Sequence, residues 1–196
     1  MPKNKSSKIY IAFYKPYGVL SQFTPESKGD LTLKDYFPKI PKDVYPIGRL
    51  DKDSEGLLFL TNDNIFKNKI LDPINKISKT YWAQVDGLIS REALVSLAEG
   101  VPIRIKNSSY QTRPAKASII LPENIPERNP PIRYRKSIPT SWVSLTISEG
   151  KNRQVRRMGA AVGFPVLRLI RVQIANYKLS SLKPGNWEKI HPGMVY

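Results

Sequence analysis

Hydrophobic and polar residues alternate along several short segments of the chain, with the two-residue period that is typical of half-buried β-strands. In residues 142–148, for example, Val143, Leu145 and Ile147 alternate with less apolar neighbours. Alternation and short apolar runs predict strands at residues 9–14, 57–61, 79–87, 116–121, 142–148 and 165–174. Many connections are too short for the crossovers that parallel strands need, which favours a mixed, largely antiparallel sheet.

Helices are predicted where a capping residue precedes an apolar stripe with helical spacing. Thr32 and Asp35 match a capping box. Ser90 caps a later helix, which Gly100 closes near its end. The expected helices cover residues 33–37, 64–72, 91–100 and about 152–162. A few helices on one face of such a sheet give the α+β fold class.

Three segments lack either pattern. Residues 122–141 carry five prolines among arginines and a lysine, which predicts a stiff basic loop. Residues 1–8 are expected to be a disordered basic arm, and the chain is expected to be loop-like from Lys183, with residues 191–196 as a tail. The remainder, residues 9–190, has a length that suits one compact domain or two small lobes that share a cleft.

The charge of the chain changes this picture most. Lys and Arg number 32 against 16 Asp and Glu, so the formal net charge is +16. A domain with this excess attracts polyanions, and most of its affinity depends on salt. The alternative is a charged surface that only aids solubility, but the basic residues cluster instead of spreading evenly.

Several classes of chemistry are disfavoured. The chain has no cysteine and one histidine, His191, which argues against Cys nucleophiles, Cys-ligated zinc, histidine metal sites and a Ser–His–Asp triad. Walker, HExxH, EF-hand and GxSxG motifs are missing from the sequence. No apolar run approaches the roughly 20 residues that span a bilayer. We therefore expect a cytoplasmic protein that does not span a membrane, and metal-dependent or nucleotide-hydrolysing chemistry is disfavoured.

Residues 48–63, GRLDKDSEGLLFLTND, place a charged turn directly before an apolar strand. Asp51 follows Arg49 by two residues, and a carboxylate at the rim of a sheet beside a guanidinium stays ionised. It is then available as a nucleophile or base. Gly48 and Gly56 permit a tight backbone there. The alternative is a solvated loop of acidic and basic residues.

Residues 149–158, EGKNRQVRRM, place arginines at the start of a helix, where phosphate or carboxylate binds well. Because Val155 and Met158 must face the core, Arg156 points toward the edge of the buried face and suits a carboxylate such as Asp51. The alternative is a cationic surface helix.

The strand KTYWAQVDG carries two adjacent aromatic residues. Trp82 is predicted to lie in the core. Tyr81, on the opposite face, could stack on an extruded base. The basic loop of residues 122–141 could grip an RNA backbone, or be a linker without a partner.

Four stretches together resemble one family. FYKPYGVLSQFT, PIGRLDKDSEGLLFLTND, KTYWAQVDG and EGKNRQVRRMGAAVGFPVLRLIRV resemble the RsuA-type ribosomal RNA pseudouridine synthases, occur in the family's order and cover nearly the whole chain. The resemblance implies the pseudouridine synthase fold, a mixed, mainly antiparallel sheet across two lobes with a central cleft and flanking helices. Within this family the chain resembles the large-subunit branch most, because it carries the insertion RNPPIRYRKSIPTSW and is expected to lack an N-terminal S4 domain.

The resemblance implies an isomerase that converts a uridine of 23S rRNA to pseudouridine without cofactor, metal or ATP. Asp51 would be the nucleophile, attacking the sugar or the base of a flipped-out nucleotide. Tyr81 would stack on the base, Arg156 would hold Asp51, and Arg49 would support the flipped state. Further RNA contacts are expected from Lys15, Arg153, Arg157, Arg133, Arg135 and Lys136. The partner is free 23S rRNA or an assembly intermediate, and the enzyme is expected to be a monomer.

Two rival functions fit parts of the pattern. A non-catalytic RNA-binding protein would use the basic surface but not the carboxylate. A glycosidase would pair Asp51 with Asp53 or Glu55. In an extended turn Asp51 and Asp53 project to opposite sides, which makes that pairing poor.

Overall fold

The computed structural model describes residues 7–132, 139–180 and 182–196. Most of the predicted N-terminal arm, and the predicted RNA contacts Arg133, Arg135 and Lys136, lie outside the described residues.

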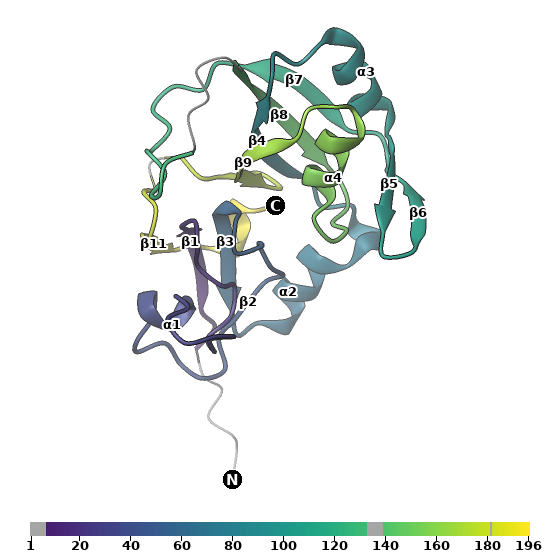
Figure 1. The fold of residues 1–196 in the computed structure, drawn as a ribbon. Coiled ribbons are helices and arrows are strands. Elements are labelled where there is room, and N and C mark those ends of the chain that lie inside the picture. The colour runs from purple at the N-terminus through teal and green to yellow at the C-terminus, as the bar shows by residue number, and fades with distance from the viewer. Residues whose placement is uncertain (1–6, 133–138, 181) are drawn as a thin grey trace.

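One sheet of nine strands organises the described part of the chain, with a separate two-stranded hairpin beside it (Figure 1). The strands are β1 Tyr10–Lys15, β2 Tyr45–Pro46, β3 Glu55–Thr61, β4 Lys79–Asp86, β5 Pro102–Ile105, β6 Ser108–Gln111, β7 Lys116–Ile120, β8 Thr140–Ile147, β9 Val166–Ile174, β10 Tyr177–Lys178 and β11 Trp187–Lys189. The order is β11-β1-β3-β9-β4-β8-β7, with β2 on β3 and β10 on β9. Among the strand pairs of the described residues, only β3 with β9 is parallel, so the predicted mixed, mainly antiparallel sheet is confirmed.

The first three helices begin at the caps that the sequence predicts, whereas the fourth begins later than predicted. They are α1 Leu33–Tyr36, α2 Asn64–Leu71, α3 Arg91–Glu99 and α4 Gln154–Ala161, with 3₁₀ turns at Pro73–Asn75 and Pro192–Met194. Thr32 and Asp35 form the full capping box of α1. Asp63 and Ser90 each accept a backbone hydrogen bond at the start of α2 and α3.

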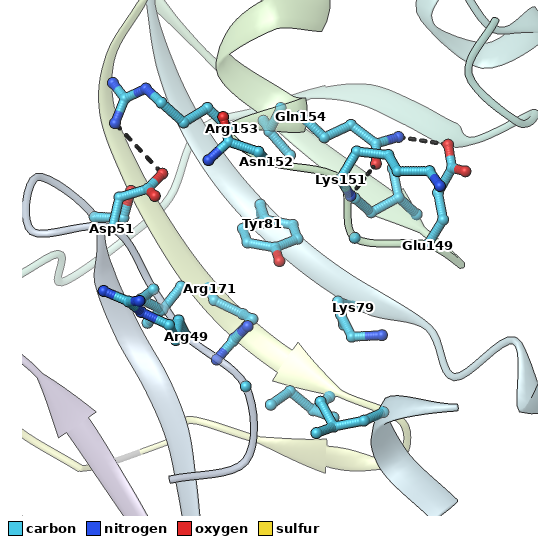
Figure 2. Close-up of a pocket in the computed structure, with 18 of the residues that line it drawn as sticks. Arg49, Asp51, Lys79, Tyr81, Glu149, Lys151, Asn152, Arg153, Gln154 and Arg171 are labelled. Carbon is cyan, nitrogen blue, oxygen red and sulfur yellow. Dashed lines mark hydrogen bonds and ion pairs between the residues drawn. The ribbon is translucent and has the colours of Figure 1, made fainter. Parts of the chain in front are cut away.

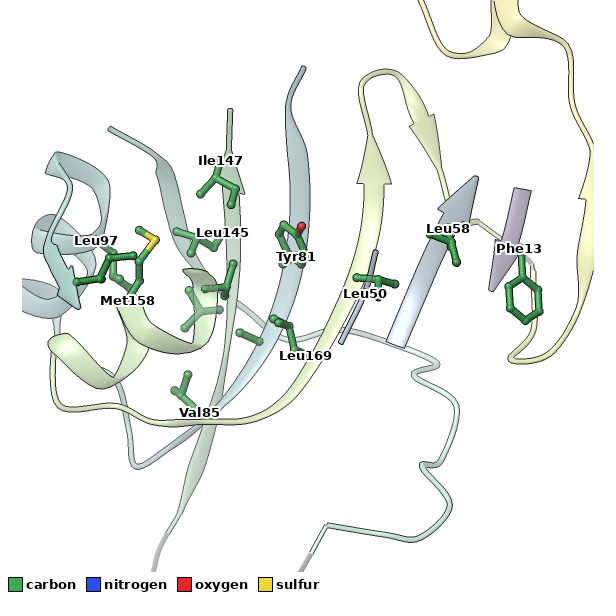
Figure 3. Close-up of a cluster of buried hydrophobic side chains, with 14 of the residues drawn as sticks. Phe13, Leu50, Leu58, Tyr81, Val85, Leu97, Leu145, Ile147, Met158 and Leu169 are labelled. Carbon is green, nitrogen blue, oxygen red and sulfur yellow. The ribbon is translucent and has the colours of Figure 1, made fainter. Parts of the chain in front are cut away.

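Strand β3 is buried on both faces because each face meets its own hydrophobic cluster. Leu58 and Leu60 belong to one cluster, which continues through Tyr81 to α3 and α4 (Figure 3). Leu57 and Phe59 belong to the other, on the opposite face of the sheet. The alternation of β3 between two cores fixes the charged turn before it to the body of the protein.

The sheet divides into two lobes that meet at β3 and β9 (Figure 1). Their parallel pairing comprises Glu55 with Ile170 and Gly56 with Arg171. Gly56 has φ +104°, and a Cβ added there would lie 2.3 Å from the Arg171 carbonyl oxygen. Glycine is therefore required where the lobes join.

Three predictions about the fold are wrong. The chain after Lys183 is not loop-like throughout, because β11 covers the open edge of β1. Residues 191–196 also pack on the body, with Val195 fully buried. The predicted core residue Trp82 is only partly buried. The face of β4 that α4 covers carries Tyr81 instead, which is 8% exposed.

Candidate active site

A cavity of about 800 Å³ opens between the lobes. Asp51 and Arg49 line it from the lobe of β3, whereas Tyr81, Arg153 and Arg171 line it from the other lobe. Figure 2 shows Tyr81 at its centre, with Asp51 on one side. The structure thus brings together four of the predicted site residues, from three separated sequence stretches.

The backbone on both sides of Asp51 is fixed by hydrogen bonds. The Ser21 hydroxyl accepts from the Leu50 amide at 3.0 Å and donates to the Leu50 carbonyl at 2.7 Å. The Asp51 carbonyl accepts from the Ser54 amide at 3.0 Å, which closes a tight turn. Leu50 is buried in the core, while about a third of the Asp51 side chain (35%) stays exposed. The carboxylate is held in place yet accessible.

Arg153 reaches across the cavity to the turn. Its Nη1 lies 3.4 Å from Asp51 Oδ2, as Figure 2 shows. The same guanidinium donates to both oxygens of Asp53, at 3.1 and 2.8 Å. Arg153 caps α4 in the left-handed conformation, with φ +51°. Such a backbone is unusual for a residue with a side chain, and in proteins it concentrates at functional sites.

Asp53 completes this charged bridge between the lobes. Burial acts to raise the pKa of the Asp53 carboxyl, but the hydrogen bonds from Arg153 and the charges of Arg156 and Arg153 outweigh it and leave the pKa below its usual value. Asp51 and Asp53 share one guanidinium, so they do not project to opposite sides. The prediction assumed an extended turn, and the closed turn at Ser54 removes that assumption.

Arg156 does not make the predicted ion pair with Asp51. Its Nη2 donates to the Asp53 carbonyl at 2.7 Å, its Nη1 to the Val166 carbonyl at 2.9 Å, and its Nε lies 3.4 Å from Asp53 Oδ2. The prediction let the helix begin before Arg153. Because α4 begins at Gln154, Arg153 rather than Arg156 points at Asp51.

Lys15 is fully buried, which contradicts its predicted role as an RNA contact. Its Nζ donates to the carbonyls of Val19 at 2.7 Å and Pro16 at 3.0 Å. Burial lowers the pKa of Lys15 to about 7, against the opposing charges of Glu55, Asp53 and Asp51. The lysine therefore shapes the loop beneath the acidic turn.

The remaining predicted contacts differ in accessibility. The Arg49 side chain is 68% exposed at the cavity rim, where it lies 3.7 Å from Glu26. Arg157 is partly buried, donates to carbonyls of Asn152 and Arg104, and does not line the cavity.

Sequence reasoning missed Glu149. Its buried carboxylate accepts from Tyr110 Oη at 2.6 Å, the Arg113 amide at 3.0 Å and Gln154 Nε2 at 2.5 Å. Burial acts to raise the pKa of Glu149, but these donors lower it below its usual value. The network ties the β5–β6 hairpin to the start of α4. Little in the sequence indicates that Glu149 is buried, because a glutamate that follows a strand is usually exposed to solvent.

Comparison with known proteins identifies the family. The family model for RNA pseudouridylate synthase matches residues 9–161. The chain belongs to this family. Its members isomerise uridine in RNA to pseudouridine, and this RNA pseudouridine synthase is accordingly an enzyme.

Similar proteins cover nearly the whole chain. A ribosomal large subunit pseudouridine synthase E from Vibrio parahaemolyticus is 51% identical over 92% of this chain and 73% of its own length. The protein of that name from Xanthomonas axonopodis pv. citri is 48% identical over 90% of both chains. A pseudouridylate synthase crystal structure matches with a TM-score of 0.77 at 28% identity, covering 96% of this chain and 72% of that one. The predicted family, its large-subunit branch and the fold are confirmed.

Two further findings concern the described residues of this synthase. No helix among them is long and apolar enough to cross a membrane. No group of three or more His, Cys, Asp or Glu side chains gathers there in a way that could hold a metal ion. The side chains that meet in the cavity are instead carboxylate, guanidinium and phenol groups, which suit acid–base and nucleophilic chemistry.

Proposed function

We propose that this synthase converts a specific uridine of 23S rRNA to pseudouridine, with Asp51 as the nucleophile. The observation that carries the proposal is the placement of Asp51. It is accessible, held by a fixed turn and paired with Arg153, in the same cavity as Tyr81. The similar proteins named large subunit pseudouridine synthase E support the choice of 23S rRNA.

The reaction requires a uridine that has left its helix. Base extrusion costs a few kcal/mol, which stacking and phosphate contacts offset. In the cavity the Asp51 carboxylate attacks C1′ of the ribose or the uracil ring, and the bond between C1′ and N1 breaks. The uracil turns, C5 bonds to C1′, and the bond to Asp51 breaks, which frees the carboxylate. C5 loses a proton and N1 gains one, so the number of protons is unchanged. Substrate and product have the same atoms, so no co-reactant is consumed.

The chain's own residues divide this work. Arg153 positions the Asp51 carboxylate through the contact at 3.4 Å. Arg156 does not contact Asp51. It holds Asp53, the other carboxylate that Arg153 binds, and so acts on the site through Asp53. Tyr81 offers an aromatic face for stacking and a hydroxyl that can help to remove the C5 proton.

RNA binding follows from the basic charge of the chain, +16 overall. Arg49 is the best placed predicted contact, because its exposed pair with Glu26 contributes little and exchanges easily. We further propose that the enzyme acts in the cytoplasm as a monomer. Its substrate is free 23S rRNA or a ribosome assembly intermediate.

The decisive test replaces Asp51 with Asn. Pseudouridine is mapped in protein-free 23S rRNA after incubation with each variant, and RNA affinity is measured in parallel. Asp51→Asn should bind RNA as the wild type does and form no pseudouridine. The control is Asp43→Asn, which changes an exposed carboxylate outside the cavity and should leave turnover unchanged.

Other outcomes would select a rival. Wild-type turnover by Asp51→Asn would remove Asp51 from its role. RNA binding by the wild type without pseudouridine formation, on both free 23S rRNA and ribosome assembly intermediates, would favour a non-catalytic RNA-binding protein. Release of free uracil would favour a glycosidase.

A further inference from the structure

Arg171 is the most conspicuous group in the cavity that the proposed chemistry does not use. It is 5% exposed, and its Nε donates to the Leu57 carbonyl at 2.8 Å. Its Nη2 is buried and has no hydrogen-bond partner in the described structure. An unsatisfied buried guanidinium nitrogen is costly, so its retention beside an active site calls for a ligand.

A β-bulge aims this side chain at the cavity. Thr80 pairs with Gln173, but the next residue of β4, Tyr81, pairs with Arg171. The extra residue, Val172, brings Arg171 into register with Tyr81, so both face the cavity that they line. Bulges next to active sites commonly redirect a side chain in this way.

Lys79 lies two residues before Tyr81 and therefore shares its face of β4. It also lines the cavity, and its Nζ donates to the Ile77 carbonyl at 2.8 Å. Burial, and to a lesser extent the charge of Arg171, lower the pKa of Lys79 to about 8. Figure 2 shows the two basic side chains on either side of the Tyr81 hydroxyl.

Neither cation is neutralised. Among the residues described, no carboxylate forms an ion pair with Arg171 or with Lys79, although Asp51, Asp53 and Glu55 all pair with other arginines. A cavity lined by two positive charges without a carboxylate paired to them raises the local concentration of anions.

We propose that Arg171 and Lys79 form a subsite for a backbone phosphate of the substrate RNA, next to the flipped uridine. The inference rests on the proposed function, because that function brings an RNA strand into the cavity. A phosphate is favoured over a uracil carbonyl because it carries the charge that two cations require. It also accepts several hydrogen bonds from a guanidinium fork and an ammonium group.

The test measures how salt weakens RNA binding. The dissociation constant for a 23S rRNA transcript is determined over a series of KCl concentrations, in the Asp51→Asn background so that no turnover occurs. Lys79→Met should reduce the slope of log K against log[KCl] by about 0.7 to 1, the value for one lost phosphate contact. Arg171→Met should do the same. The control is Lys189→Met, which removes an exposed charge on β11, outside the cavity, and should leave the slope unchanged.

The variants also separate this inference from its rivals. Arg171 lies at the junction of the lobes, so circular dichroism checks its fold, and Lys79→Met tests the subsite on its own. If folded variants keep the wild-type slope but lose turnover when Asp51 is present, the two cations contact the uracil and not a phosphate. That result would refute the phosphate subsite. Failure of the wild type to form pseudouridine on both free 23S rRNA and assembly intermediates would refute the proposed function, whereas the slopes are measured without turnover.

Discussion

Replacing Gly56 with alanine tests the junction on which the whole site depends. An added Cβ would lie 2.3 Å from the carbonyl oxygen and 2.7 Å from the amide nitrogen of Arg171. Both neighbours are backbone atoms, so neither can swing away. The residue also has φ +104°, which a side chain strongly disfavours.

Two costs add at this position. A residue forced into such a backbone conformation costs about 1–3 kcal/mol, and overpacking in a close-packed interior costs about 1–3 kcal/mol more. We therefore expect Gly56→Ala to lose about 2–6 kcal/mol of unfolding free energy. With an m-value of about 2 kcal/mol/M, the urea midpoint should fall by about 1–3 M.

The assay is urea unfolding followed by circular dichroism and by fluorescence. Gly150→Ala is the matched control, because Gly150 does not have a positive φ and an added Cβ there meets nothing within 4 Å. It should unfold near the wild-type midpoint. A Gly56→Ala protein as stable as the wild type would refute the claim that β3 and β9 require this close approach.

Two further predictions concern buried charges. Because the pKa of Lys15 is lowered to about 7, the unfolded chain binds more protons above that pH, and stability should rise from pH 7 to 9 by up to about 1.4 kcal/mol per unit. Urea midpoints of Lys15→Met at both pH values should show a smaller rise, and an equal rise would contradict the burial of this amine. Because the pKa of Glu149 is lowered, its stabilisation is present above the usual glutamate pKa and lost as pH falls through the lowered value. In the same assay, Glu149→Gln should therefore lose about 1.5–3 kcal/mol of unfolding free energy at pH 7 and less in acid. A loss that does not change with pH would show that the charge of Glu149 does not stabilise the fold.

The main strands and the helices could be predicted because each carries a local signal. The β5–β6 hairpin could not, since its exposed serines and basic residues break the alternation. Strand β11 has three exposed residues, so only the open edge of β1 specifies it. Tertiary pairing, rather than local sequence, decides such short strands.

The site shows the same division between local and tertiary information. A turn of charges before an apolar strand indicated Asp51, and the strand face indicated Tyr81. The partner of Asp51 depended on where α4 begins, and that boundary is set by the left-handed backbone of Arg153. Helix ends are uncertain by one or two residues from sequence, which is enough to exchange Arg153 for Arg156.

The buried charges explain why the lobes meet where they do. Glu55 binds Arg168 through two hydrogen bonds of 2.8 Å, and Asp53 is shared by Arg153 and Arg156. Both carboxylates come from the turn and start of β3, whereas all three arginines belong to the other lobe. The Glu55–Arg168 pair is buried, so removing one partner would leave an uncompensated buried charge, which costs about 3–5 kcal/mol. The Asp53–Arg153 pair is more than a third exposed and contributes less. These pairs therefore hold the two lobes together, while Arg171 keeps a positive charge at the junction without a carboxylate partner. A protein optimised for stability alone would not keep such a charge there.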